Sequence, residues 1–133
     1  MTASRLLMID DEPDIGALVQ RVAEGLNFEM NFVTRGDAFK AKYRSFHPDI
    51  VILDLSMPET DGIELLAFLA EEKSRARVVI LSGFDPSIVI GACRLGEDRG
   101  LDMAGIASKP VRVAELRSIL DSLKEKQRCP SNN

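Results

Sequence analysis

Five short apolar runs recur along the chain, and a segment with helical spacing follows each of them. The runs cover residues 5–9, 28–33, 50–54, 77–81 and 101–107. Continuous apolar runs of this length, bounded by turn residues, are typical of buried parallel strands. In the second run, Phe28, Met30 and Phe32 alternate with polar residues. This alternation predicts a strand near an edge of the sheet.

Apolar positions at helical spacing predict five helices. They extend over about 13–26, from the turn at 35–37 to about 46, and over about 62–73, 86–95 and 111–126. A polar break is expected at 96–100. The pattern therefore predicts one α/β domain over residues 1–126, a doubly wound five-stranded parallel sheet with helices on both faces, and a polar tail or linker at 127–133.

Acidic, hydroxyl and basic residues follow four of the predicted strands. They are Asp10 and Asp11 after the first, Asp54 at the end of the third, Ser82 after the fourth and Lys109 after the fifth. The carboxyl ends of parallel strands meet at one edge of a sheet, where ligands bind. The acids suit a small divalent cation, most naturally Mg²⁺. Asp54 is a candidate nucleophile for phosphoryl transfer, Ser82 can donate a hydrogen bond to a phosphoryl oxygen, and Lys109 supplies positive charge.

Three acids are adjacent after the first strand, where one would suffice to cap the helix that begins at Pro13. Either Asp11 or Glu12 is expected to act as that cap, and Asp61 as the cap of the third helix. The carboxylates repel one another by roughly 1 kcal/mol per pair in water, and by more when shielded. We therefore expect a positive group beside them.

Composition and charge narrow the classes of protein. The 133 residues, 45% hydrophobic and 29% charged, fit one globular domain. A net charge of -4 argues against direct nucleic-acid binding. No apolar stretch could span a membrane, the amino terminus lacks the layout of a signal peptide, and Cys93 and Cys129 have no metal-like spacing. We expect cytoplasmic residence, and an exposed, structural role for His47.

The ordered set of motifs over residues 5–126 closely resembles the receiver domain of two-component response regulators. The set comprises the acidic pair Asp10 and Asp11, Asp54 followed by Met57-Pro58 and Asp61-Gly62, then Ser82, and Lys109-Pro110. The resemblance implies a flavodoxin-like fold with sheet order 2-1-3-4-5. It also implies a signalling role in place of an enzyme activity, since receivers catalyse only their own phosphoryl transfer and dephosphorylation.

The family's chemistry carries over to matching residues. Asp54 would accept a phosphoryl group from a phosphohistidine of a sensor histidine kinase or a phosphotransfer protein. Mg²⁺ would be bound by Asp11, Asp54 and the backbone carbonyl of Ser56, with Asp10 contacting it through water. Ser82 and Lys109 would hold the phosphoryl oxygens, and the Lys109–Pro110 bond is expected to be cis. The usual output face, the fourth helix and fifth strand, would shift on phosphorylation, and a homodimer is an expected form.

The chain departs from the family pattern in two places. Ile106 stands where the family often has Tyr or Phe, and we interpret it as core packing of the fifth strand. The interval from Ser82 to Lys109 is longer than usual, with the extra residues expected around 96–102. This version resembles receivers joined to cyclic-di-GMP phosphodiesterase output domains. Ser56 and Phe84 occupy places that tune dephosphorylation in the family.

Three alternative interpretations require residues or features that differ from this sequence. A haloacid-dehalogenase-like phosphatase needs a second Asp two positions after Asp54, where this chain has Ser56. A flavin-binding module needs a phosphate-cradling loop after the first strand, where the acids Asp10 to Glu12 would repel phosphate. A degenerate receiver that acts as a protein-binding scaffold is disfavoured by the complete set of site residues.

Overall fold

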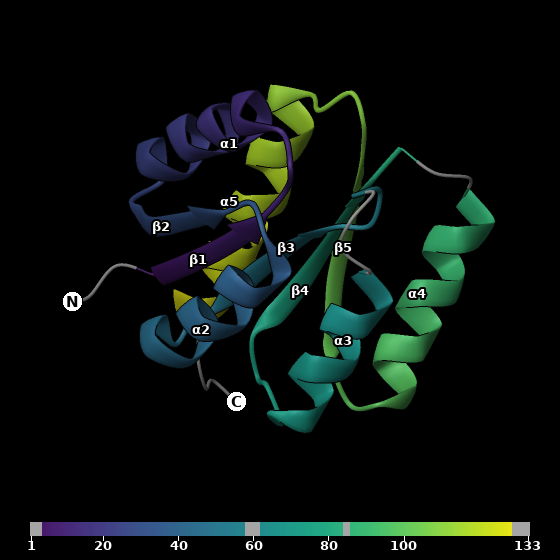
Figure 1. Cartoon of the computed structure of the whole chain (residues 1–133). Coiled ribbons are helices and arrows are strands. Elements are labelled where there is room, and N and C mark those ends of the chain that lie inside the picture. Colours follow the sequence, from purple (N-terminus) through teal and green to yellow (C-terminus); the bar gives the residue numbers. More distant parts are fainter. Residues whose placement is uncertain (1–3, 58–61, 84–85, 129–133) are drawn as a thin grey trace.

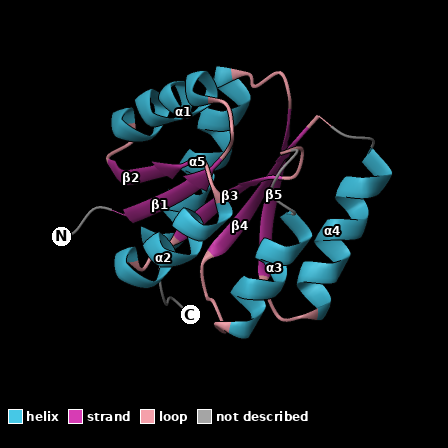
Figure 2. Ribbon diagram, in the orientation of Figure 1, coloured by secondary structure: helices cyan, strands magenta, loops and turns pink. Residues whose placement is uncertain are grey.

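The computed structural model describes residues 4–57, 62–83 and 86–128. In this part of the chain one sheet of parallel strands lies between two layers of helices (Figure 1). The strand order is β2-β1-β3-β4-β5, which confirms the predicted fold (Figure 2). The strands are β1 (Ser4–Ile9), β2 (Phe28–Val33), β3 (Ile50–Asp54), β4 (Arg77–Ser82) and β5 (Asp102–Ser108). β2 lies at an edge of the sheet, as its alternating pattern predicted.

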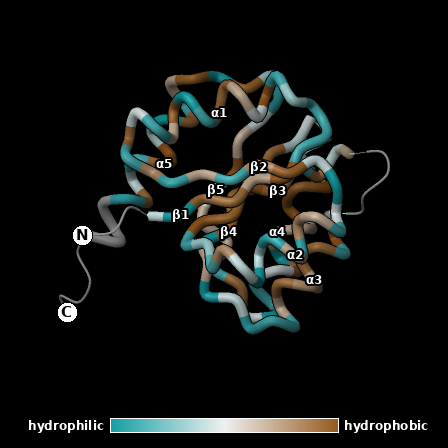
Figure 3. Tube along the Cα trace, turned by 60° about the vertical axis from the view of Figure 1, so that its left-hand side comes forward, coloured by the Kyte–Doolittle hydropathy of each residue, from teal (hydrophilic) through white to brown (hydrophobic). Residues whose placement is uncertain are grey.

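The helices divide between the two faces of the sheet. α1 (Pro13–Gly25) and α5 (Val113–Arg128) cover one face, and α2 (Gly36–Phe46), α3 (Gly62–Glu71) and α4 (Pro86–Asp98) cover the other. Figure 3 shows the hydrophobic strands between these layers. None of the helices in the described ranges is long and apolar enough to span a bilayer.

Each central strand contributes side chains to both halves of the core. Consecutive residues of a strand point to opposite faces. Leu7 and Leu53 therefore pack toward α2, α3 and α4, while Leu6 and Ile52 pack toward α1 and α5. All four are essentially inaccessible to solvent. Burial on both faces explains why these strands are continuous apolar runs in the sequence.

The fourth helix is longer than the sequence pattern predicted. α4 continues to Asp98, although a break was expected from residue 96. Gly96 is buried against β5, and a Cβ atom added there would lie 2.4 Å from Met103 Sδ. The missing side chain thus lets α4 approach β5, and this packing keeps Gly96 within the helix.

A β-bulge in β5 takes up a further residue of the long interval between Ser82 and Lys109. Val78 pairs with Met103, but Val79 pairs with Gly105, so the register shifts by one residue. The interval between Ser82 and Lys109 thus contains the 13-residue α4 and the extra residue of this bulge.

Other boundaries differ from expectation by a turn or less. α3 ends at Glu71 and not at 73, and α5 begins at Val113 and not at 111. α5 also extends to Arg128 and so includes two residues that were predicted for the tail. Pro58, Asp61, Phe84 and Cys129 lie outside the described residues, so the predictions for them stay predictions.

Candidate functional site

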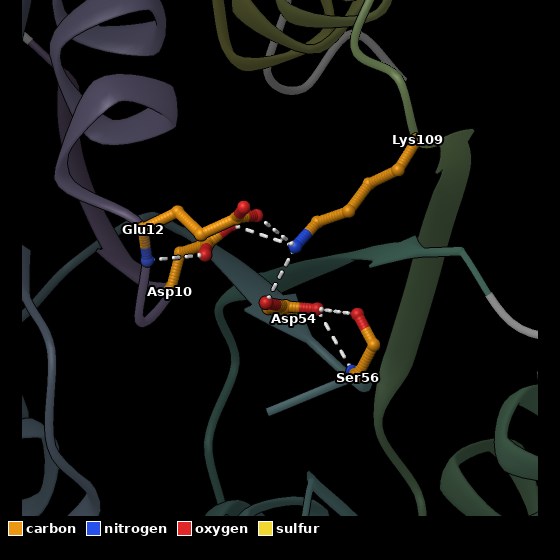
Figure 4. Close-up of polar contacts among 5 residues, drawn as sticks. All are labelled: Asp10, Glu12, Asp54, Ser56 and Lys109. Atoms are coloured by element: carbon orange, nitrogen blue, oxygen red, sulfur yellow. Dashed lines mark hydrogen bonds and ion pairs between the residues drawn. The ribbon is translucent and has the colours of Figure 1, made fainter. Parts of the chain in front are cut away.

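The ends of β1, β3 and β5 bring acidic and basic side chains together at one edge of the sheet (Figure 4). Asp54 is the last residue of β3, Asp10 directly follows β1, and Lys109 directly follows β5. The backbone N–H of Asp10 donates to Val33 at 3.2 Å, and that of Lys109 donates to Ser82 at 3.0 Å. These bonds hold the starts of the two loops against neighbouring strands and so fix the site residues.

The Asp54 carboxylate is fully buried, and each of its oxygens accepts hydrogen bonds. Oδ1 accepts from the backbone N–H of Ser56 at 2.8 Å and from its hydroxyl at 2.7 Å, while Oδ2 accepts from Lys109 Nζ at 2.8 Å. Burial by itself would raise the pKa of Asp54. The hydrogen bonds from Lys109 and Ser56 outweigh burial and lower the pKa below its usual value. Asp54 is therefore held as a carboxylate.

Asp10 is equally buried but less well supported. Its Oδ1 accepts the backbone N–H of Glu12 at 2.9 Å. Its Oδ2 accepts no hydrogen bond and lies 3.4 Å from Lys109 Nζ. Burial raises the pKa of Asp10 to about 7, and the nearby Asp54 charge adds to the rise. Asp10 therefore carries a carboxylate oxygen with unused capacity to bind a cation or a proton.

Lys109 supplies the positive charge that the acidic run required. Its Nζ lies 2.8 Å from Asp54, 3.1 Å from Glu12 and 3.4 Å from Asp10. Burial would lower the pKa of Lys109, but the hydrogen bonds to Asp54 and Glu12 raise it well above its usual value. The ammonium is thus charged at neutral pH. The Lys109–Pro110 peptide bond is cis, as the resemblance implied.

The contact between Glu12 and Lys109 was not predicted from the sequence. Glu12 is the N-cap residue of α1, but its side chain makes no hydrogen bond to the helix end. The expectation that Glu12 caps the helix through its side chain is therefore wrong. Its carboxylate instead reaches Lys109, 97 positions away in the chain. The available clue was its residue type, since Glu is not among the favoured N-cap residues.

Asp11 and Ser82 lie at the same edge. Asp11 is exposed, and carboxylate oxygens of Asp10, Asp11 and Glu12 lie within 4.8 Å of one another. Ser82 is 4% exposed at the end of β4, and its backbone carbonyl accepts the Lys109 N–H. Hard carboxylate oxygens at this spacing, one of them buried without a hydrogen bond, fit Mg²⁺.

The exposure of Ile106 shows that the core-packing interpretation is wrong. Its side chain is 45% exposed on β5 and so is not part of the core.

His47 is exposed where α2 ends, in a left-handed conformation with φ 54°. It is not among the described residues that gather around Asp54.

Comparisons with known proteins agree on one family. The family model described as the response regulator receiver domain matches residues 6–121. The chemotaxis protein CheY of Listeria monocytogenes is 32% identical over 95 residues, which cover 69% of this chain and 79% of CheY. The regulatory protein AtoC of Escherichia coli is 29% identical over 98 residues, but the match spans only 21% of AtoC.

A solved structure extends the likeness over almost the entire chain. The crystal structure of a response regulator from Colwellia psychrerythraea is 32% identical to this protein, with a TM-score of 0.78. The match covers 95% of this chain and 100% of that structure.

Proposed function

Because this chain belongs to the response regulator receiver domains of two-component signalling, we propose that it accepts a phosphoryl group on Asp54. The donor is a phosphohistidine of a sensor histidine kinase or of a phosphotransfer protein. The observation that supports this most strongly is the Asp54 carboxylate itself, which is buried, ionised and hydrogen-bonded to Lys109 at the carboxyl edge of the sheet.

The proposed reaction is a displacement at phosphorus. A carboxylate oxygen of Asp54 forms a bond to phosphorus while the phosphorus–nitrogen bond breaks, and its electron pair leaves with the imidazole. The product is an acyl phosphate. Lys109 lies within hydrogen-bond distance of Asp54, and we propose that its ammonium stabilises the oxygens of the transferring group. Ser82 would donate its hydroxyl to one of them.

The acidic residues have a separate role in this proposal. Asp10, Asp11, Asp54 and the backbone carbonyl of Ser56 would hold Mg²⁺, which would offset the negative charge that gathers at the site. Oδ2 of Asp10 supports this role, because it is buried, accepts no hydrogen bond and has only the 3.4 Å ion pair with Lys109 to offset its charge. Ser56 already orients Asp54 through two hydrogen bonds to Oδ1.

The output of the switch is proposed to lie on α4 and β5. Phosphorylation adds roughly -1.5 to -2 charges and strong acceptors beside Ser82, at the end of the strand that neighbours β5. Because Ile106 already lies largely at the surface, we propose that the signal changes the position of α4 relative to β5 and not the burial of this side chain. A histidine kinase or phosphotransfer protein and an output domain or effector are the proposed partners, and the cytoplasm is the proposed location.

Intact-mass analysis tests the central claim. Wild type and Asp54→Asn, which keeps the shape of the side chain, are incubated with acetyl phosphate or phosphoramidate, with Mg²⁺ or with EDTA. We expect one phosphoryl adduct that requires Mg²⁺ and is lost in the variant. An adduct on Asp54→Asn would refute the assignment of Asp54. If folded wild type gains no adduct from either donor or from a phosphorylated phosphotransfer protein, the scaffold interpretation replaces the proposal.

A further inference from the structure

Glu12 makes a long-range contact that its place in the fold does not require. It lies in the loop between β1 and α1, yet its Oε1 is 3.1 Å from Lys109 Nζ in the loop after β5. Any residue could provide the backbone carbonyl that Ile15 and Gly16 use at the start of α1. We infer that Glu12 is a positioning residue that holds the Lys109 ammonium beside Asp54. This inference rests on the proposed phosphoryl transfer.

The need for such a residue follows from the partners of Lys109. Two of its three carboxylates, Asp10 and Asp54, belong to the proposed metal set and share their charge with any bound cation. Glu12 is the third, and its side chain is 57% exposed while that of Lys109 is 16% exposed. Glu12 thus contacts the ammonium from a more exposed position than the buried acids, next to the Asp10 carboxylate (Figure 4). A long lysine side chain has many rotamers, and this contact restricts them.

The inference predicts a loss of rate with little loss of metal binding. At saturating Mg²⁺, Glu12→Ala should slow the labelling of Asp54 by acetyl phosphate about 5- to 20-fold, because the ammonium is no longer held in place. Glu12→Gln, which keeps an oxygen that can accept from Lys109, should recover part of the rate. Asp14→Asn is the matched control, because Asp14 is an exposed acid in the first turn of the same helix. It should change the rate less than about twofold.

A double-mutant cycle separates positioning from a general charge effect. In a Lys109→Ala background, Glu12→Ala should slow labelling no further, since no ammonium remains to be positioned. If Glu12→Ala slowed labelling by the same factor with and without Lys109, the inference would be overturned. A large loss of Mg²⁺ affinity in Glu12→Gln, by itself or with Lys109→Ala, would also overturn it, because Glu12 would then be a metal ligand.

A second measurement needs neither metal nor phosphoryl donor. Denaturant midpoints are measured in EDTA for wild type, Glu12→Ala, Lys109→Ala and the double variant. The effects of the two substitutions on the midpoint should be non-additive. Glu12→Ala should lower the midpoint when Lys109 is present, and raise it when Lys109 is absent, because the remaining carboxylates then repel less. Additive midpoints would contradict the contact itself. Failure of the proposed function would appear differently, as wild-type protein that gains no adduct from any donor.

Discussion

Replacing Asp10 with asparagine should stabilise the metal-free protein at neutral pH. The Asp10 side chain is fully buried, and its Oδ2 accepts no hydrogen bond. Ionising such a group costs free energy that the 3.4 Å ion pair with Lys109 only partly offsets. Asparagine has the same shape, carries no charge and keeps the oxygen that accepts the Glu12 N–H.

The raised pKa of Asp10 sets both the size of the destabilisation in wild type and the pH range over which it develops. Burial, the largest cause, raises the pKa of Asp10 from 3.8 to about 7. Between those values the folded protein binds the proton more tightly than the unfolded chain does, so wild-type stability falls as pH rises from about 4 to about 7. About 1.4 kcal/mol per unit sets an upper limit of about 4 kcal/mol for the cost at pH 8. Asp54 acts in a separate window, because its lowered pKa affects stability only below about pH 4.

Denaturant unfolding in EDTA from pH 4.5 to pH 8 measures this cost. The variant and wild type should be similar in stability at the acidic end, and the variant should become more stable as pH rises. Asp14→Asn removes an exposed acid of the same helix and should give a difference that stays nearly constant over this range. A gap between Asp10→Asn and wild type that does not change with pH, or a less stable variant at pH 8, would refute the reasoning.

Further predictions concern packing. Gly16→Ala should lower the unfolding free energy by about 1–3 kcal/mol, because a Cβ there would lie 2.5 Å from the Phe32 ring. Gly91→Ala, with open space around its Cβ, should raise it by about 0.5–1 kcal/mol through helix propensity. Ile106→Ala should cost less than about 1 kcal/mol because the side chain is 45% exposed, whereas Leu66→Ala should cost about 2–5 kcal/mol. Urea unfolding checks each value, and a large loss in Ile106→Ala would restore the core-packing interpretation.

The strands could be predicted because burial leaves a plain trace in the sequence, whereas their order was implied by the resemblance to receiver domains. Residues 6–9, 50–54 and 78–82 are buried in succession, so each central strand is an almost unbroken apolar run that ends at the sheet edge. The end of α4 could not be predicted in this way. Gly96 resembles a helix stop, yet its missing side chain is what Met103 requires, and that contact joins two elements.

The exposure of Ile106 has a similar cause. Simple alternation along β5 would place Met103 and Ile106 on opposite faces. The bulge adds one residue to β5, Ala104, opposite the step from Val78 to Val79 in β4, so Ile106 turns to the same face as Met103. A slip of one residue moves every later side chain across the sheet. Where a bulge lies depends on pairing with β4, which local sequence patterns do not reveal.

In the candidate site, too, some features could be predicted from the sequence and others could not. Asp10, Asp54, Ser82 and Lys109 were found because each directly follows or ends a strand, and parallel topology brings strand ends together. The contact of Glu12 with Lys109 depends on side-chain conformations in two loops that are 97 residues apart. Charge alone indicated that a positive group must lie near the acids, but it could not assign which acid would hold it.

The cost of burying Asp10 and the proposed affinity for Mg²⁺ have one origin. The carboxylates of Asp10, Glu12 and Asp54 lie around a single ammonium, so a second cation would relieve repulsion that Lys109 cannot offset alone. Asp10→Asn removes the share of that repulsion that comes from Asp10. The variant should therefore be more stable than wild type in EDTA, but added Mg²⁺ should stabilise it less, because the stabilisation grows with the logarithm of the Mg²⁺ concentration divided by Kd and the variant binds more weakly. If Mg²⁺ raised the midpoints of both proteins equally, the Asp10 oxygen that accepts no hydrogen bond would have no part in holding the metal.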